Sequence, residues 1–251
     1  MMNVPAYLDR INYRGPLNVD AETLRQLQVA HLRSVPFENL SIHAHEPIVL
    51  DDESLFEKIV ERRRGGFCYE LNGLFAALLR AIGFRVTMLS AEVANNDEIF
   101  SPPFDHMTLM VPLTDRWLVD VGFGDSFIEP LRIDKRGAQT QGERAYRIEP
   151  GGDYLVLQQR LSETPEWKSA YRFKLTPHQY ADYLDRCRFH QTSPESHFTR
   201  NRICSILTPA GRISVSDTRF IVTKDGVRND YPVRDDEEYR ALLLEHFGIV
   251  M

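Results

Sequence analysis

The hydrophobic pattern of this chain changes its period at residue 84, and this change constrains the fold more than any other feature. Before it, apolar residues recur every three to four positions, as on one face of a helix. After Gly83 they alternate with polar residues, as in Phe84-Arg-Val-Thr-Met-Leu-Ser-Ala-Glu-Val93, and a period of two is typical of a half-buried strand. Helices followed by strands favour an α+β architecture over repeated βαβ units.

Three helices are predicted in the first third of the chain. One follows Asp20, a second opens with the acidic residues at 51–53, where the helix dipole favours them, and a third starts near Cys68. Gly83 is a typical helix end. The apolar face of the third helix comprises Cys68, Leu71, Phe75, Leu78, Leu79 and Ile82.

The rest of the chain is predicted to be strands with two further helices. Thr176-Pro177 indicates a helix start, because proline is favoured in the first turn, and Asp235 begins a final helix. Alternating patterns predict strands at 84–93, 105–111, 116–121, 153–159, 202–207 and 213–222.

Composition excludes several classes of function. The 251 residues are 43% hydrophobic and carry a net charge of -6 with dispersed basic residues, which argues against general nucleic-acid binding. No segment approaches the roughly 20 apolar residues of a membrane span, and no leader-like run opens the chain, so we expect no membrane association and a cytoplasmic location. The three cysteines form no CxxC pair, which indicates neither a disulfide framework nor a zinc ribbon.

The stretch RRRGGFCYELN places Cys68 at the start of a helix, directly after Arg62–Arg64 and Gly65-Gly66. A helix N-terminus and nearby cations both lower the pKa of a thiol, and the thiolate is the nucleophile. The glycines allow backbone N–H groups to approach the sulfur and a developing oxyanion. Taken alone, however, a cysteine on an apolar helical face more often simply packs in the core, so a partner base decides the interpretation.

A partner base is predicted on the strand pair that follows. His106 opens DHMTLMV, and Asp120 lies in WLVDVGFG, one hairpin away. If the strands pair with an even register sum, the two side chains project from the same face. The aspartate then fixes the imidazole tautomer, and the free ring nitrogen takes the thiol proton. A slip of one residue would separate them and leave an ordinary strand histidine and a turn aspartate.

At this point RGGFCYELN, DHMTLMV and WLVDVGFGD, in that order, together resemble the arylamine N-acetyltransferase family. SVPFENLSI and SPESHF also resemble it, so the similarity spans most of the chain. The resemblance implies an α+β fold with a cysteine-protease-like Cys-His-Asp core formed by Cys68, His106 and Asp120. Its three parts are an N-terminal helical bundle at 1–83 with the nucleophile, a β-barrel at 84–190 with His and Asp, and a C-terminal α/β lid at 191–251.

The resemblance also implies a reaction and its substrates. Cys68 accepts an acetyl group from acetyl-CoA as co-substrate and passes it to an arylamine, arylhydrazine or N-hydroxyarylamine in a ping-pong sequence without a metal. Glu38 and Arg64 are implied to form a structural ion pair, and Gly122 and Gly124 to lie beside the CoA pyrophosphate. The residues implied around the small aromatic acceptor are Phe37, Val93, Phe123 and Phe198.

Several alternatives remain at this stage. The same triad serves hydrolysis or transglutaminase-like transfer, since acyl-enzyme chemistry recurs on unrelated folds. Within the family, an amide synthase of polyketide biosynthesis is a further candidate, and a binding protein without turnover is another. A zinc site is disfavoured because its candidate ligands match no standard spacing; these are Cys187, His190, His197 and Cys204.

Overall fold

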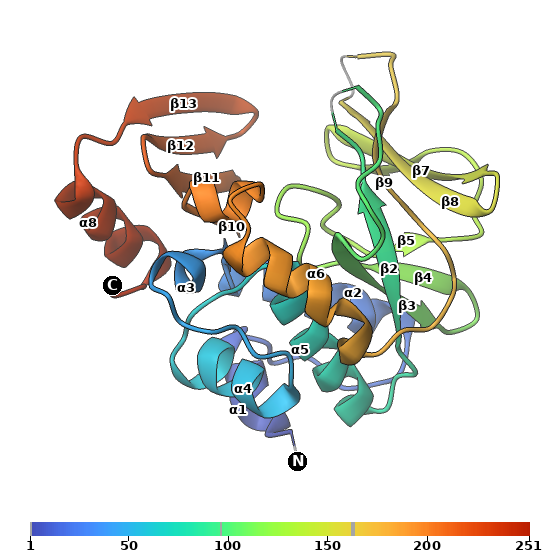
Figure 1. The fold of residues 1–251 in the computed structure, drawn as a ribbon. Helices are drawn as coiled ribbons and strands as arrows, with labels where there is room; N and C mark the ends of the chain where they lie inside the picture. The colour runs from blue at the N-terminus through green and yellow to red at the C-terminus, as the bar shows by residue number, and fades with distance from the viewer. Residues whose placement is uncertain (1, 96, 162–163) are drawn as a thin grey trace.

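The computed structural model describes residues 2–95, 97–161 and 164–251. Figure 1 shows three parts: helices below, a large twisted sheet at the upper right, and a smaller sheet with the C-terminal helix at the upper left. The helices are α1 (Val4–Arg10), α2 (Ala21–Ser34), α3 (Leu40–His43), α4 (Asp52–Phe56) with a π-helical continuation η1 (Glu57–Glu61), α5 (Cys68–Ile82), α6 (Tyr180–Thr192), α7 (His197–Arg200) and α8 (Asp236–Phe247).

Helix α5 is the centre of the helical part. The predicted start at Cys68 and end at Gly83 are both confirmed: the Glu70 carboxylate accepts from the Phe67 N–H, and Gly83 takes the left-handed conformation with φ 119°. Every residue from Cys68 to Leu79 is buried. Because α5 is apolar on nearly all sides, helices α1, α2, α4 and α6 and strand β3 pack around it.

The large sheet has eight strands in the order β5-β4-β3-β2-β9-β8-β7-β6 and is antiparallel throughout. Its edge strands β5 and β6 are joined by side chains. Gln139 bonds to the backbone N–H and carbonyl of Arg132 at 2.9 and 3.0 Å, and Gln141 bonds to Ile128 and Glu129. The sheet is therefore a nearly closed barrel, in agreement with the predicted β-barrel. Its strands are β2 (Thr87–Val93), β3 (His106–Pro112), β4 (Arg116–Val119), β5 (Leu131–Arg132), β6 (Gln139–Gln141), β7 (Arg144–Gly151), β8 (Tyr154–Leu161) and β9 (Lys168–Phe173).

The smaller sheet combines the chain's C-terminal segment with one strand from the helical part. Its order is β1-β10-β11-β12-β13, and β1 pairs Phe37 with Ser205. Helix α8 packs on this sheet through Tyr239 and Leu243. The strands are β1 (Phe37–Glu38), β10 (Ile203–Thr208), β11 (Gly211–Ser216), β12 (Arg219–Lys224) and β13 (Val227–Pro232).

Two predicted elements are wrong in detail. The segment 213–222 was predicted as one strand, but it contains parts of two strands, β11 and β12, joined by a turn at 217–218. The alternation of apolar residues continues across this turn and gives no sign of it. Thr176-Pro177 does not begin α6, because the next residue, His178, donates its N–H to the Met88 carbonyl of the barrel. The helix begins at Tyr180 instead, where the Asp182 carboxylate accepts from the Gln179 N–H.

After the barrel the chain returns to the helical part. Helix α6 crosses in front of α5 in Figure 1, and its Tyr183 and Cys187 belong to the same buried cluster as Cys68 and Phe75. The two boundaries between the three predicted domains stay a prediction. Among the described residues, no helix has the length and apolarity needed to cross a bilayer.

Candidate active site

Three elements bring Cys68, His106 and Asp120 to one region. Cys68 is the first residue of α5, His106 opens β3, and Asp120 directly follows β4. Leu109 pairs with Val119, so the register sum is even and the two side chains share a face, as required. His106 Nε2 lies 2.7 Å from Asp120 Oδ2, and both side chains are almost fully buried.

The Asp120 carboxylate accepts four hydrogen bonds. Oδ2 accepts from His106 and from the Tyr171 hydroxyl at 3.0 Å, and Oδ1 accepts from the Asn72 amide and the Gly122 N–H, both at 2.9 Å. Burial alone would raise the pKa of Asp120, but the charge and bond of His106, with the Asn72 and Gly122 bonds, hold it below its usual value. Asp120 is therefore an ionised, immobile partner for His106.

Asn72 connects the helix of Cys68 to both partner strands. Its amide donates to the Met107 carbonyl at 2.7 Å as well as to Asp120, and its carbonyl accepts from the Val121 N–H at 2.9 Å. The side chain is fully buried. With all three contacts made, Asn72 fixes α5 against β3 and against the segment after β4.

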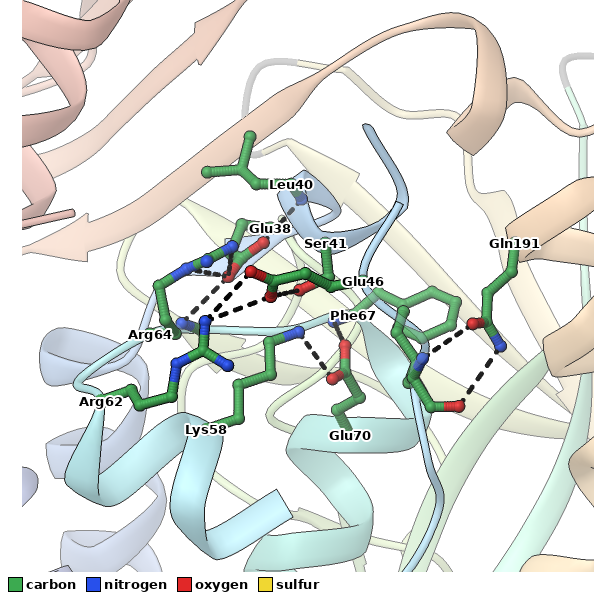
Figure 2. Close-up of polar contacts among 12 residues, drawn as sticks. Glu38, Leu40, Ser41, Glu46, Lys58, Arg62, Arg64, Phe67, Glu70 and Gln191 are labelled. Carbon is green, nitrogen blue, oxygen red and sulfur yellow. Dashed lines mark hydrogen bonds and ion pairs between the residues drawn. The ribbon is translucent and has the colours of Figure 1, made fainter. Parts of the chain in front are cut away.

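The structure places Cys68 at the predicted helix N-terminus, but the predicted cations do not contact it. Burial raises the pKa of the Cys68 thiol well above its usual value, and a hydrogen bond from the Met107 N–H only partly offsets this. The upstream arginines are occupied elsewhere: Figure 2 shows Arg62 reaching Glu46 and Arg64 facing Glu38. A thiolate at Cys68 therefore requires a proton acceptor, and Met107, whose N–H reaches the sulfur, directly follows His106.

The glycine pair also has a different role from the predicted one. The Gly65 N–H donates to Glu38 Oε1 at 3.2 Å and the Gly66 N–H to the Pro36 carbonyl at 3.4 Å, so neither is directed at an oxyanion. A side chain on Gly65 would overlap the Pro36 carbonyl oxygen, and one on Gly66 would approach Glu70 to 2.7 Å. Close packing of this loop explains both glycines.

Glu38 and Arg64 lie as the resemblance implied. Arg64 Nε is 3.1 Å from Glu38 Oε1, and the two side chains are 7% and 0% exposed. Glu38 Oε2 also accepts from the Leu40 N–H at 2.7 Å. This ion pair joins β1 to the loop that precedes Cys68, and beside it Lys58 pairs with Glu70 at 2.7 Å (Figure 2).

The residues predicted to surround an acceptor form two groups, and all are half-buried. Phe198 packs on Phe67, the residue before Cys68, with ring centroids 5.6 Å apart, and Phe37 lies 6.2 Å from Phe198. Phe123 packs edge-on against the His106 ring at 5.1 Å. Val93 pairs with Tyr171 across β2 and β9.

The two glycines predicted beside CoA differ from each other. The Gly122 N–H is already donated to Asp120, and a side chain there would approach the Cys68 Cα to 2.7 Å. Gly122 thus packs against the Cys68 helix, and its N–H is already donated within the protein; its placement beside CoA stays a prediction. Gly124 adopts φ 89°, with space around its Cα, and its N–H has no acceptor among the described residues.

The four residues of the disfavoured zinc site do not form one. Both His190 nitrogens are hydrogen-bonded, to Ser196 and Asp105, and Cys204 belongs to the core under α8. Within the described ranges, no three His, Cys, Asp or Glu side chains converge as metal ligands.

Two surface cavities of about 420 and 410 Å³ are both lined by residues other than Cys68, His106 and Asp120.

Sequence reasoning missed the residues that hold the site together. Asn72 had a signal, because it lies one helical turn after Cys68 on an otherwise apolar helix, where a buried amide needs partners. Tyr171 and Gln28 had none. Tyr171 reaches Asp120 from β9, and the Gln28 side chain of α2 accepts from the Asp120 N–H at 3.3 Å, both across long sequence separations.

Comparison with known proteins gives consistent matches over the whole chain. A model of the N-acetyltransferase family matches residues 20–251. The arylamine N-acetyltransferase of Escherichia coli (strain K12) is 34% identical over 97% of this chain and 87% of its own. Proansamycin X synthase of Amycolatopsis mediterranei (strain S699) is 31% identical over 97% of this chain and 96% of its own. The structure of Mycobacterium marinum arylamine N-acetyltransferase in complex with CoA superposes with a TM-score of 0.90 at 32% identity, covering 98% of this chain and 93% of that one.

Proposed function

Since the chain belongs to the arylamine N-acetyltransferase family, we propose that it transfers an acetyl group from acetyl-CoA to an aromatic amine or hydrazine, or to an N-hydroxyarylamine, through an acetyl-Cys68 intermediate. Cys68 is the nucleophile, His106 the base and Asp120 the group that orients it. The observation that carries the proposal is the buried 2.7 Å bond between His106 and Asp120, which is fixed to the Cys68 helix by Asn72.

The first half-reaction acetylates the enzyme. His106 takes the Cys68 proton, the sulfur attacks the thioester carbonyl of acetyl-CoA, and the C–S bond to CoA breaks. The imidazolium then returns its proton to the leaving CoA thiolate. Asp120 stabilises that imidazolium, because an ionised carboxylate 2.7 Å from Nε2 favours the charged ring.

The second half-reaction reverses these roles. The amine attacks the acetyl carbonyl on Cys68, His106 takes a proton from the amine nitrogen, and the Cys68 sulfur leaves and is reprotonated. Because burial raises the pKa of the Cys68 thiol well above its usual value, the cysteine of the Cys68–His106 pair is a neutral thiol at rest. Proton transfer within the pair, with no exchange to solvent, then accompanies each attack.

The residues near Gly124 suit the anionic part of CoA. Ser126 Oγ is buried without a hydrogen-bond partner, and the Gly124 N–H has no acceptor in the described chain. Two arginines, Arg144 and Arg212, converge on the neighbouring Asp125 at 2.8 and 3.3 Å. The donors and cations of this segment fit a phosphate-bearing substrate, and the related M. marinum enzyme has been solved with CoA.

Aromatic side chains support an aromatic acceptor. Phe123 contacts the His106 ring, and Phe198 and Phe37 lie next to the residue before Cys68. Half-buried aromatic rings next to His106 and next to Phe67 provide surface on which a flat amine can pack. An amide synthase of polyketide chains is the alternative within the family, supported by the identity to proansamycin X synthase. The cytoplasmic location stays a prediction.

Release of CoA with and without an acceptor tests the function. Purified protein given acetyl-CoA alone should release one equivalent of CoA per chain and then slow, and added aniline should restore continuous release with formation of acetanilide. Continuous release in water alone, at the same rate as with the amine, would identify a hydrolase. Absence of even the first equivalent would contradict acetyl transfer through an enzyme thiol.

A further inference from the structure

A second histidine–carboxylate pair lies beside the candidate active site. Asp105 directly precedes His106, and its Oδ1 accepts from His190 Nε2 at 3.0 Å and from Arg186 Nε at 2.7 Å. Both partners come from α6. The His190 side chain is 4% exposed, that of Asp105 15% and that of Arg186 21%, so the cluster is largely removed from water.

The Asp105 carboxylate of this cluster is stabilised by both of its partners. Burial would raise the pKa of Asp105, but the hydrogen bonds and charges of His190 and Arg186 hold it well below its usual value. The carboxylate is therefore ionised at neutral pH. Because a buried ion pair is costly to break once formed, the cluster holds the start of β3 firmly against α6.

His190 continues the contact toward α7. Its Nδ1 lies 3.1 Å from Ser196 Oγ, and that same oxygen accepts from the Phe198 N–H at 3.2 Å as the N-cap of α7. Ser196 is 2% exposed. The Phe198 ring then packs on His190 at 5.2 Å and on Phe67 at 5.6 Å.

A continuous path thus runs from the strand of the base to the residue before the nucleophile. It passes from Asp105 through His190 and Ser196 to Phe198, and from Phe198 to Phe67. The backbone carbonyl of Phe198 is fixed separately by the Asn39 amide at 2.8 Å. The Phe198 side chain, by contrast, is located by the path through His190 and by its ring contacts.

We propose that Asp105, Arg186, His190 and Ser196, called here the Asp105 cluster, are positioning residues that hold Phe198 against Phe67 and thereby set the fit of aromatic acceptors. The inference rests on the proposed function. The cluster acts on the second half-reaction, because Phe198 is one of the rings around the predicted acceptor. The first half-reaction depends on His106 and Asp120. The other hydrogen bonds of the Asp120 carboxylate, from Asn72, Tyr171 and Gly122, involve none of these four residues.

Two variants interrupt the path at opposite ends. Asp105→Asn removes the charge on the β3 side, and Ser196→Ala removes the hydroxyl that joins His190 to α7 without changing any charge. Asp185→Asn is the matched control. Asp185 is an exposed carboxylate on α6, the helix that carries Arg186 and His190. Circular dichroism and thermal unfolding establish that each variant is folded, and the milder Ser196→Ala tests the proposal if Asp105→Asn does not fold.

Three rates are measured for each variant: the first-turnover release of CoA, and steady-state transfer to 2-naphthylamine and to hydrazine. We expect the KM for 2-naphthylamine to rise about tenfold in both path variants, the typical effect of losing one buried bond to a charged or ordered group. In Ser196→Ala, first-turnover release and the KM for hydrazine should stay within about twofold of wild type, since neither uses the ring of Phe198 and no charge is changed. The double variant should resemble the single ones, because both interrupt the same path.

The outcomes separate this inference from the proposed function. Wild-type protein that releases no CoA in the first turnover overturns the proposed function and this inference with it. Normal release with an unchanged KM for 2-naphthylamine in the folded variants overturns the inference alone. A parallel loss in all three rates would identify the cluster as a general stabiliser of the fold and would also overturn it.

Discussion

At the scale of single residues, activation of Cys68 depends on its proton acceptor. Burial raises the pKa of all three cysteines, that of Cys187 to about 12. Cys187 contacts the Gln191 amide, and Cys204 lies among core side chains under α8. The sulfur of Cys68 instead accepts from Met107, next to a histidine held by an ionised aspartate. We therefore expect the reactivity of Cys68 to depend on His106.

The His106→Gln variant tests this dependence. In wild-type protein at pH 7, iodoacetamide should label Cys68 faster than Cys187 or Cys204, and the variant should lose this advantage. The expected loss is on the order of 100-fold, the usual contribution of a positioned general base. Mass spectrometry of the peptides over time gives the three rates, and His178→Gln serves as a control histidine outside the site. Equal labelling of Cys68 in wild type and His106→Gln would show that the sulfur is activated by something else.

At the scale of elements, the site depends on how α2 and α5 pack. Gln28 of α2 bonds to the Asp120 N–H and to the Ile128 carbonyl, which joins α2 to both ends of the loop after β4. Three residues later, His31 is fully buried between Tyr7, whose hydroxyl lies 2.9 Å from Nδ1, and the Phe75 ring of α5. The α2–α5 contact thus contains a histidine that has no access to water.

His31 makes the stability of this contact depend on pH. Burial, aided by the charge of Arg10, lowers the pKa of His31 from 6.5 to about 3. The folded state therefore holds His31 neutral, and its contribution is fully present above pH 6.5 and is lost as the pH falls from about 6.5 toward 3. Over that window the contribution changes by about 1.4 kcal/mol per pH unit.

Denaturant unfolding of wild type and His31→Gln between pH 7 and pH 4.5 measures this term. As the pH falls, the free energy of unfolding of wild type should decrease more steeply than that of the variant. The difference in slope should be about 1.4 kcal/mol per pH unit, the value for one proton. Other groups titrate alike in both proteins and cancel in the comparison. Parallel curves would mean that His31 ionises equally in the folded and unfolded chain.

The sequence was informative for local elements and uninformative for contacts across long separations. The start and end of α5 depend on neighbouring residues and were predicted. The register of the β3–β4 hairpin was left as a condition, and the structure shows the even sum that the His106–Asp120 pair requires. Strands β1 and β5 have two residues each, which is too short for any periodic signal. The role assigned to Arg62–Arg64 was wrong because Glu38 and Glu46, which bind two of these arginines, lie on other segments.

At the scale of the whole molecule, the site lies where all three parts of the chain meet. The helices supply Cys68, the barrel supplies His106 and Asp120, and Phe198 comes from the C-terminal segment. The smaller sheet contains β1 of the helical part, and Arg212 of β11 reaches Asp125 of the barrel loop. These contacts join distant segments, so the cysteine motif alone could not reveal them. The motif therefore left two roles open for Cys68, a packed core residue and a nucleophile. The assembled fold favours the nucleophile.

The central claim is that Cys68 carries the acetyl group between donor and acceptor. Mass spectrometry of the intact protein after brief exposure to acetyl-CoA, followed by peptide mapping, tests it most directly. We predict one acetyl group per chain on the peptide that contains Cys68, and its loss as acetanilide when aniline is added. An acetyl group found only on Cys187, on Cys204 or on lysines, or transfer to aniline from protein that never carries one on Cys68, would contradict the account.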